Sequence, residues 1–334
     1  MQLFELTQKL IDIESVTPNE REIGDFLWRY LHELALRFGG AAERMHVEPG
    51  RDNIFVRFGD PVVVLSTHMD TVPPFIASRV DEQYIWGRGA CDTKGIIAAM
   101  ITAVVRLLET GHRNLGLLFV VGEERNSAGA LAAARSPRGS KFLINGEPTE
   151  NKLALGSKGA LRLELIAHGR MAHSAYPELG ESAIEKLLNA LERIRRIELP
   201  VDAVLGRCTL NIGTIVGGRA PNVIPDEARA EIFVRAVGDV SDLRVAVAQA
   251  AEPDTEAQEV LFIPPVHLGA VDGFETTVVA FTTDIPAFDS KWGQPFLIGP
   301  GSIHVAHTNE ERVPKSELVA AVDLYQRLVL QLSK

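Results

Sequence analysis

The sequence lacks the cysteines, long apolar runs and excess positive charge that are typical of disulfide-stabilised, membrane-spanning and nucleic-acid-binding proteins. It contains only two cysteines in 334 residues, too few for a disulfide framework, so a reducing, cytoplasmic location is the expectation. No apolar run is long enough to span a bilayer, and the first residues lack the basic start and unbroken apolar centre of a secretory signal. Lysine and arginine total 34 against 44 acidic residues, a net charge of −10, which argues against a general affinity for nucleic acids or anionic membranes.

The rest of the composition is typical of a globular protein. Hydrophobic residues make up 46% and charged residues 23% of the chain, a balance that excludes disordered and collagen-like proteins. A chain of this length exceeds one ordinary core and suits two packed domains. Two domains are therefore expected.

Short, continuously apolar runs alternate with helical patterns in the first half of the chain. Strands are predicted over 62–67, 115–121 and 142–145, and helices over 95–108 and 128–134. Strands that are buried on both faces are continuously apolar. The pattern therefore predicts an α/β domain with a mainly parallel sheet covered by helices.

Signals near the two ends of the chain predict further elements of the same domain. Thr17 is expected as the N-cap of a helix, with Pro18 in its first position and Glu20 closing a capping box. A strand is predicted over 295–298 and a final helix over 315–332.

The pattern changes near residue 156. Apolar and polar residues alternate over 161–165, which is typical of a strand with one wet face. The elements that follow are predicted in the order β-α-β-β-α-β of a small ferredoxin-like layer. Residues 156–264 are therefore expected to form an inserted α+β lid domain, and residues 1–155 plus 265–334 the main domain.

Five residues with metal-binding side chains follow predicted strands or precede a predicted helix. They are His68, Asp92, Glu124, Glu147 and His307. The carboxyl ends of parallel strands meet at one edge of a sheet, and sites are built at that edge. Two imidazoles and three carboxylates gathered there would suit a pair of divalent ions of zinc type.

Residues beside these candidates have predicted roles of their own. Asp70 lies two positions after His68 and can accept a hydrogen bond from its far ring nitrogen, which would fix the tautomer. Glu123 and Glu124 are neighbours on an extended backbone, so their side chains diverge. Glu124 is predicted to hold metal and Glu123 to be the general base. Cys91 is interpreted as a small buried residue rather than a soft ligand.

Each motif also has an ordinary structural interpretation. Asp92 stands in a glycine-rich loop, Gly87–Gly95, where it could simply cap the following helix. Glu123 and Glu124 could be solvated surface acids, and His68 could be a buried histidine at a strand end with a polar neighbour.

Taken in order, the motifs resemble a known family of two-zinc hydrolases. The motifs are Ser66-Thr67-His68-Met69-Asp70-Thr71-Val72-Pro73, Gly87 to Gly95, Gly122-Glu123-Glu124, Gly146-Glu147-Pro148-Thr149 and Ala306-His307. The family includes acetylornithine deacetylase, succinyl-diaminopimelate desuccinylase, aminoacylase and glutamate carboxypeptidase. The segments over 281–288 and 297–304 look most like acetylornithine deacetylase.

The resemblance implies a role for each matched residue. It makes Asp92 the bridge between two divalent metal ions. These ions would be zinc, and cobalt could replace zinc. His68 and Glu147 would complete one site, and Glu124 and His307 the other. Glu123 matches the family's catalytic base.

The resemblance also extends to the lid domain. His173, in Gly169-Arg170-Met171-Ala172-His173-Ser174, matches a histidine that polarises the scissile carbonyl, often across a homodimer formed through the lid. Asn222 and Arg235 fit positions that grip a substrate carboxylate, and Lys158 would add positive charge at the hinge. Arg125 departs from the family, which more often has a small polar residue there, and the chain is shorter than typical members. Both departures concern substrate choice more than the metal site.

The predicted function is hydrolysis of the amide bond of a small N-acyl amino acid by a metal-activated water. One alternative is a dipeptidase, aminopeptidase or carboxypeptidase of the same two-metal type, for which a dipeptide would be the substrate. Another is a metal-free homologue that serves as a binding module. A serine hydrolase built on Ser302 is weaker, because the strand–elbow–helix context is missing.

Overall fold

The computed structural model describes all residues from 1 to 334 and divides into two compact units. The first unit contains Met1–Leu155, Leu268–Thr277 and Thr283–Lys334, and the second contains Gly156–His267 and Val278–Thr282. Compared with the predicted boundaries, the chain returns to the first unit at Leu268 rather than at 265, and residues 278–282 fall in the second unit. No helix combines the length and the apolar character needed to cross a membrane.

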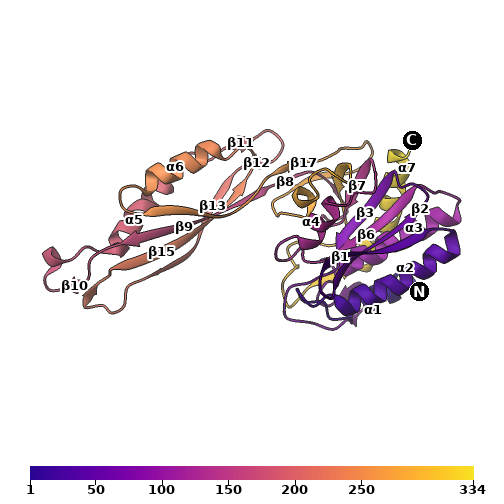
Figure 1. The fold of residues 1–334 in the computed structure, drawn as a ribbon, viewed down its shortest axis with the longest axis horizontal. Helices are drawn as coiled ribbons and strands as arrows, with labels where there is room; N and C mark the ends of the chain where they lie inside the picture. Colours follow the sequence, from indigo (N-terminus) through magenta and orange to yellow (C-terminus); the bar gives the residue numbers. More distant parts are fainter. The chain divides into compact units, whose positions relative to one another are not determined.

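A six-stranded sheet organises the first unit, with its strands in the order β1-β2-β6-β3-β7-β19 (Figure 1). The strands are β1 (Ala41–Glu48), β2 (Arg51–Phe58), β3 (Val63–His68), β6 (Leu115–Val120), β7 (Phe142–Asn145) and β19 (Gln294–Leu297). β3 pairs in parallel with β6 and β7, and β19 pairs in parallel with β7. β1 and β2 are antiparallel. The predicted mainly parallel sheet is thus confirmed.

Helices cover both faces of this sheet, as predicted. They are α1 (Leu3–Ile11), α2 (Arg21–Phe38), α3 (Lys94–Glu109), α4 (Ala128–Ala134) and α7 (Lys315–Leu332). Apolar side chains of α1, α2, α3 and α7 share one buried cluster with the sheet. Alanines of α4 share a second cluster with Trp292 and with Phe288 of the short helix η2 (Ile285–Phe288). Strands β3, β6 and β7 are buried along their whole length or nearly so, which is why they are continuously apolar.

The start of α2 corrects one prediction. The helix begins at Arg21, so Thr17 is not its N-cap and Glu20 does not close a capping box. Instead Glu20 forms a buried ion pair with Arg51, with distances of 2.5 and 2.7 Å from its carboxylate oxygens to the guanidinium nitrogens. Leaving a buried guanidinium without a charged partner costs more free energy than leaving a helix end without a side-chain cap.

The structure also contains strands that the sequence does not predict. The hairpin of β1 and β2 lies at the sheet edge, where charged residues interrupt the apolar pattern. A small sheet contains β4 (Arg79–Val80), β5 (Tyr84–Trp86) and β20 (Arg312–Pro314). Another contains β8 (Leu153–Ser157), β17 (Val266–His267) and β18 (Thr276–Val279), in the segments through which the chain passes from one unit to the other.

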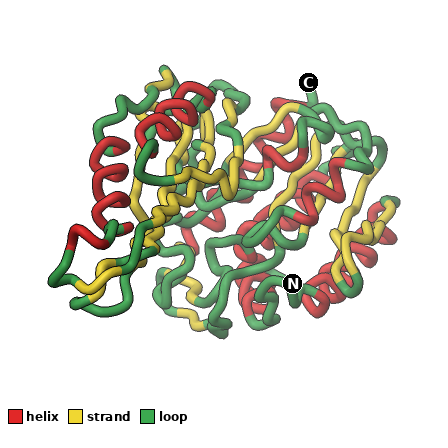
Figure 2. Tube along the Cα trace, turned by 60° about the vertical axis from the view of Figure 1, so that its left-hand side comes forward, coloured by secondary structure: helices red, strands yellow, loops and turns green.

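The second unit is built on a four-stranded antiparallel sheet, with its strands in the order β13-β15-β9-β16. Its strands and helices are β9 (Gly159–His168), α5 (Ala183–Ile194), β13 (Thr209–Gly217), β15 (Glu227–Ala236), α6 (Ser241–Ala251) and β16 (Glu256–Ile263). The two helices lie side by side on one face, with a shared apolar core (Figures 1 and 2). This is the predicted ferredoxin-like order. Smaller elements are β10 (Ala172–His173), η1 (Pro177–Leu179), β11 (Val201–Asp202), β12 (Gly206–Arg207) and β14 (Val223–Ile224).

Candidate metal centre

The sheet order brings three acid- and histidine-bearing segments to one edge. β3 ends at His68, β6 leads into Glu123 and Glu124, and β7 leads into Glu147. Because β6, β3 and β7 are adjacent and parallel, the residues that follow them emerge together at their carboxyl ends. The position of the candidate site therefore follows from the parallel pairing of these strands.

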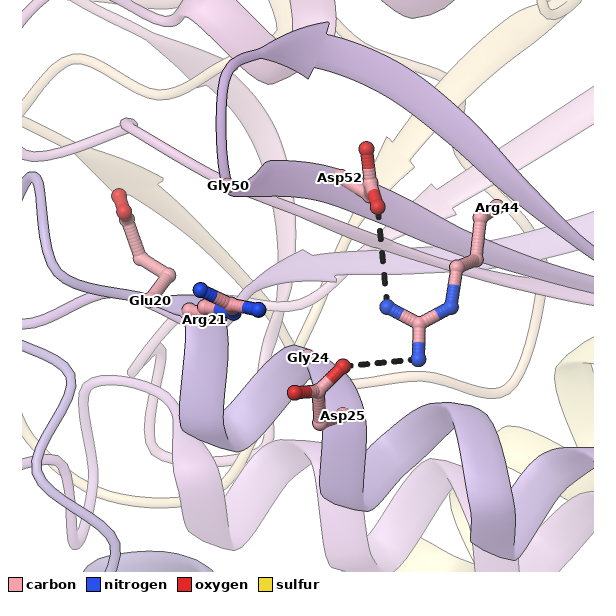
Figure 3. Close-up of a pocket in the computed structure, with 7 residues that line it drawn as sticks. All are labelled: Glu20, Arg21, Gly24, Asp25, Arg44, Gly50 and Asp52. Carbon is pink, nitrogen blue, oxygen red and sulfur yellow. Dashed lines mark ion pairs between the residues drawn. The ribbon is translucent and has the colours of Figure 1, made fainter.

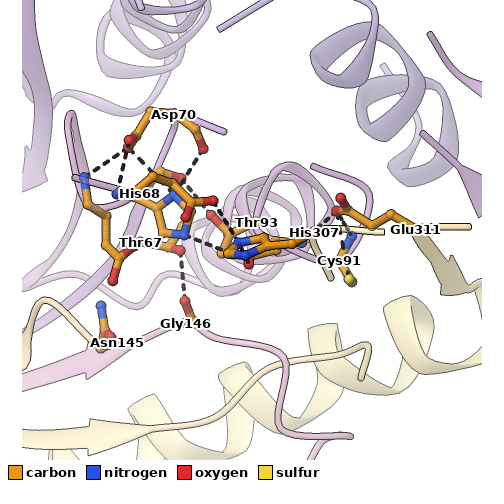
Figure 4. A network of polar contacts seen from close by, with 12 residues as sticks. Thr67, His68, Asp70, Cys91, Thr93, Asn145, Gly146, His307 and Glu311 are labelled. Carbon is orange, nitrogen blue, oxygen red and sulfur yellow. Dashed lines mark hydrogen bonds and ion pairs between the residues drawn. The ribbon is translucent and has the colours of Figure 1, made fainter. Parts of the chain in front are cut away.

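The Asp92 carboxylate lies between two imidazoles. One of its oxygens is 2.9 Å from Nε2 of His68, and the other is 3.2 Å from Nε2 of His307. The same nitrogen of His307 is 3.1 Å from a carboxylate oxygen of Glu124. Burial would raise the pKa of Asp92, but the bonds to His307 and His68 lower it below its usual value. Figure 4 shows His68 with Asp70 on one side of this network and His307 with Glu311 on the other.

Four of the five predicted ligands thus form one connected cluster. Donor atoms of His68, Asp92 and Glu124 all lie within 4.8 Å of one another, a spacing compatible with a bound cation. Glu147 belongs to the same buried region. It is only 4% exposed, one of its carboxylate oxygens has no hydrogen-bond partner, and its charge raises the pKa of His68.

Asp70 lies beside the far ring nitrogen of His68 and also holds the neighbouring turn. Nδ1 of His68 is 3.0 Å from the backbone oxygen of Asp70 and 3.6 Å from its carboxylate, so the backbone oxygen is the closer partner. The carboxylate instead accepts hydrogen bonds from the backbone N–H groups of Gly122, Glu123 and Glu124, at 2.9, 3.1 and 3.2 Å. It also accepts one from the Thr17 hydroxyl at 2.7 Å. Asp70 therefore fixes the turn that carries both acids.

Glu123 carries an elevated pKa. Burial of its carboxyl group raises the pKa well above the usual value, and the charges of Glu147, Asp284 and Glu124 raise it further, while His68 opposes the shift. A carboxyl group that holds a proton more readily than usual can exchange it with a substrate at neutral pH. The prediction of Glu123 as a proton-transfer group is compatible with this environment.

A buried ion pair holds the loop that contains Asp92. Nη1 of Arg88 is 2.6 Å from one carboxylate oxygen of Glu311, and the other oxygen accepts from the backbone N–H of Asp92 at 3.3 Å. The Thr93 hydroxyl donates to the backbone oxygen of His68 at 2.6 Å. Cys91 is buried, and burial raises the pKa of its thiol, which disfavours the thiolate form that binds metal.

Asp284, Glu311 and Arg88 are site residues that the sequence analysis does not single out. Asp284 lies within residues 281–288, for which the sequence predicts no role in the centre. It is 1% exposed, and burial together with nearby acids, among them Asp70, raises its pKa to about 7. Glu311 and Arg88 are charged loop residues of a kind that is usually exposed, and only their pairing in three dimensions explains their burial.

In the second unit the predicted residues form two groups at opposite ends of the sheet. His173 pairs with Val223 in the ladder of β10 and β14, next to Asn222, whose backbone oxygen accepts from Ser174. Arg235 lies near the other end of β15 and pairs with Ala160 of β9. The two groups are separated by about the length of β15, about 30 Å at roughly 3.3 Å per residue.

The basic group at the β9 end has little compensating charge. Arg235 is half-buried, no acidic side chain pairs with it, and its guanidinium lies 4.8 Å from the ring centroid of Phe233. Burial lowers its pKa. Lys158, next to the start of β9, donates to the backbone oxygen of Arg207 at 2.7 Å. Lys158 adds a second positive charge near this end of the sheet.

A separate hollow of about 240 Å³ lies beside the N-terminal end of α2 (Figure 3). It is lined by Glu20, Arg21, Gly24, Asp25, Arg44, Gly50 and Asp52. Its charges already pair with each other, because Arg44 lies 2.8 Å from Asp25 and 3.6 Å from Asp52. None of the predicted site residues lines it.

The donor set fits a pair of divalent cations. Nitrogen and carboxylate ligands at one buried edge, with an unpartnered oxygen on Glu147, are the donors that zinc-type ions prefer. Removing metal would leave more buried acids than imidazoles, an arrangement that is costly without a compensating cation.

Comparisons with known proteins find similar sequences over most of the chain. The sequence model of peptidase family M20/M25/M40 matches residues 64–331. A peptidase M20 domain-containing protein of Schizosaccharomyces pombe is 40% identical over 98% of this chain and 84% of its own. A protein of Aspergillus terreus named "Probable carboxypeptidase" is 38% identical over 96% of this chain and 84% of its own.

Solved structures share the fold. The aminopeptidase PepT of Bacillus cereus has a TM-score of 0.82 at 20% identity and covers 99% of this chain and 98% of its own. The M20 family metallo-carboxypeptidase Sso-CP2 of Sulfolobus solfataricus has a TM-score of 0.78 at 16% identity, with 99% of both chains covered.

The structure predicts that Asp70→Ala weakens metal binding. Without its carboxylate, three backbone N–H groups of the turn lose their acceptor, and Glu124 is no longer held in place. Loss of such a supporting group typically costs about 10- to 100-fold in metal affinity. Competition titration with a chromophoric chelator measures the change. Asp81→Ala is the matched control, since Asp81 also accepts backbone N–H bonds but lies outside the centre. Equal affinities for the two variants would contradict this role of Asp70.

Metal affinity should rise with pH. The hydrogen bonds of His307 to Asp92 and Glu124 raise its pKa to about 10, so without metal the imidazole is protonated at neutral pH. A cation can bind the nitrogen only after the proton leaves. The apparent affinity should therefore increase by up to about tenfold per pH unit for each proton released, up to the pKa of His307. Chelator competition at several pH values tests this, with His46→Gln as a control outside the centre; a flat profile would refute it.

Proposed function

This chain belongs to peptidase family M20/M25/M40, and from that premise we propose that it hydrolyses the amide bond of a small N-acyl amino acid, next to the free carboxylate. The observation that carries the proposal is the convergence of His68, Asp92, Glu124 and His307 beside Glu123. Two divalent cations, zinc or cobalt, are the proposed cofactors.

The proposed holders of the cations are those expected from the sequence. The contacts of Asp92 with both imidazoles support its proposed role as the ligand shared by two ions. His68 with Glu147 would hold one ion, and Glu124 with His307 the other. The bound ions supply Lewis-acid chemistry, which acidifies water and polarises the substrate carbonyl.

Glu123 is proposed to move the protons. Its carboxylate takes a proton from the attacking water and passes it to the nitrogen of the scissile bond. The acyl C–N bond breaks and a C–O bond forms. Both protons of the water finish on the nitrogen, so the amino acid leaves as an ammonium and the acyl group leaves as a carboxylate.

Arg235 and Lys158 are proposed to recognise the substrate carboxylate. Arg235 is half-buried and has no acidic partner, and a guanidinium binds a carboxylate through two parallel hydrogen bonds. An uncompensated cation of this kind favours substrates with a free carboxylate over those recognised through a free amine alone.

A carboxypeptidase that acts on dipeptides is the second candidate. It has the same requirement for a free carboxylate next to the scissile bond, and relatives at 36–38% identity are named "Probable carboxypeptidase". The two candidates differ in the acyl group. It is acetyl or succinyl in an N-acyl amino acid, and an aminoacyl group in a dipeptide.

Assays of the zinc- and cobalt-loaded protein test the proposal. The panel contains N-acetylornithine, N-acetyllysine, N-acetylcitrulline, succinyl-diaminopimelate and simple dipeptides. At least one substrate with a free carboxylate should be hydrolysed, and its carboxamide derivative should be a poor substrate. Glu123→Gln should keep its metal content and lose turnover by at least about a thousandfold, because the proton carrier is gone. An active Glu123→Gln protein would overturn the assigned role.

A homodimer with a shared site is also proposed. Asn222 and His173 lie at one end of the second unit and Arg235 at the other, so residues from both groups reach one substrate most simply when they come from two copies. His173 would then stabilise the oxyanion in the site of the second copy. The edge strand β13, which exposes Ile215 and Val216, offers a pairing surface for the second unit of another copy.

Mixing two inactive variants distinguishes action across the dimer from action within one chain. His173→Ala and Glu123→Gln are refolded together in equal amounts. If His173 serves the other copy, each mixed dimer has one complete site, and about a quarter of the wild-type activity should return. If His173 serves its own chain, no site is complete and activity stays at the level of the separate variants.

A further inference from the structure

Asp284 is a buried acid that forms no ion pair, and the Ser127 hydroxyl is the one protein group whose hydrogen bonding lowers its pKa. It precedes η2, which packs against α4, and it is 1% exposed. Both of its carboxylate oxygens lack a hydrogen-bond partner. Buried polar groups are nearly always hydrogen-bonded, and a buried carboxylate without a donor is costly. Such a group points to a donor that arrives with a ligand.

The surroundings of Asp284 are those of the metal centre. The charges of His68, Asp70 and Glu124 all act on its carboxyl group. Its own charge acts in turn on Glu123 and Glu147. No lysine or arginine forms an ion pair with it, whereas Asp70, which is equally buried, receives four hydrogen bonds. Asp284 therefore lies outside the predicted ligand set, and neither of its carboxylate oxygens has a donor at ordinary hydrogen-bond geometry.

We infer that Asp284 accepts a hydrogen bond from the N–H of the scissile amide and then binds the ammonium of the departing amine, an assignment that rests on the proposed hydrolysis. The reacting nitrogen must approach Glu123, because Glu123 gives it a proton. An acid neighbouring Glu123 is thus placed on the side of the leaving nitrogen. That nitrogen carries one N–H before the reaction and three afterwards, which are the donors that Asp284 lacks.

A hydrogen-bond acceptor at Asp284 distinguishes ligands by the atom that they carry at the leaving position. A hydrogen bond from the amide N–H orients the nitrogen, so that its developing lone pair is free to receive the proton from Glu123. It becomes a charge-assisted bond once the amine is an ammonium. Replacing Asp284 should therefore affect ligands that carry an N–H or an ammonium at this position, and should largely spare isosteric ligands with oxygen there.

The test compares an amide substrate with the ester that has the same acyl group and the same carboxylate. Asp284→Ala removes the acceptor, and Asp284→Asn keeps a neutral one. Asp284→Ala should lower the amide-to-ester ratio of kcat/KM by about 10- to 100-fold, the effect of a hydrogen bond to a charged group, and Asp284→Asn should lower it less. Asp289→Asn is the matched control, because Asp289 ends the same short helix but is exposed.

Product binding provides a readout that is independent of turnover. Calorimetry measures the binding of the amino acid product and of its 2-hydroxy acid analogue to the metal-loaded protein. Asp284→Asn should weaken binding of the amino acid at least about tenfold and weaken the hydroxy acid less, because one neutral hydroxyl donates a weaker bond to a carboxylate than an ammonium does. Metal content and thermal melting are measured on each variant, so that only folded, loaded protein is compared.

The outcomes separate this inference from the proposed function. If the wild-type protein hydrolyses neither substrate of the pair nor any other amide of the panel, the proposed function fails. If the wild type is active but the Asp284 variants lose amide and ester hydrolysis equally, Asp284 only shapes the metal centre and the inference is wrong. An unchanged amide-to-ester ratio with unchanged product binding also overturns it.

Discussion

Negative charge buried at one edge of the sheet is the constraint on which the rest of the structure depends. Asp92, Glu124, Glu147 and Asp284 lie close to only two imidazoles, and burial raises the pKa of three of these acids. Of these four acids, only Asp92, which touches both His68 and His307, has a lowered pKa. Buried acids of this number are tolerated when cations neutralise them. The proposed pair of divalent ions supplies that charge, and the substrate nitrogen supplies the donor that Asp284 lacks.

Two supporting acids keep the charged residues in position without being ligands themselves. Asp70 holds the backbone of the Glu123–Glu124 turn, and Glu311 holds the backbone at Asp92 while pairing with Arg88. Both act on backbone N–H groups, so they fix where the neighbouring carboxylates emerge. This division between acids that hold the loops and acids that face the reaction explains why so many carboxylates share one region.

Much of the fold and of the centre could be predicted from the sequence, because both follow from local patterns. β3, β6 and β7 are continuously apolar, and their parallel pairing places His68, Glu124 and Glu147 at one edge. The rest depends on contacts between distant segments. No local signal shows that Glu20 pairs with Arg51 rather than capping α2, or that the Asp70 carboxylate accepts hydrogen bonds from the Glu123–Glu124 turn. Asp284 is an ordinary loop acid in the sequence, and only its burial without a partner distinguishes it.

Anomalous diffraction from crystals of the zinc-loaded protein tests the central claim most directly. The account predicts two zinc peaks that both contact Asp92. One should also contact His68 and Glu147, and the other Glu124 and His307. A single peak, or peaks bound by other side chains, would contradict the assignment of this buried charge to a pair of cations.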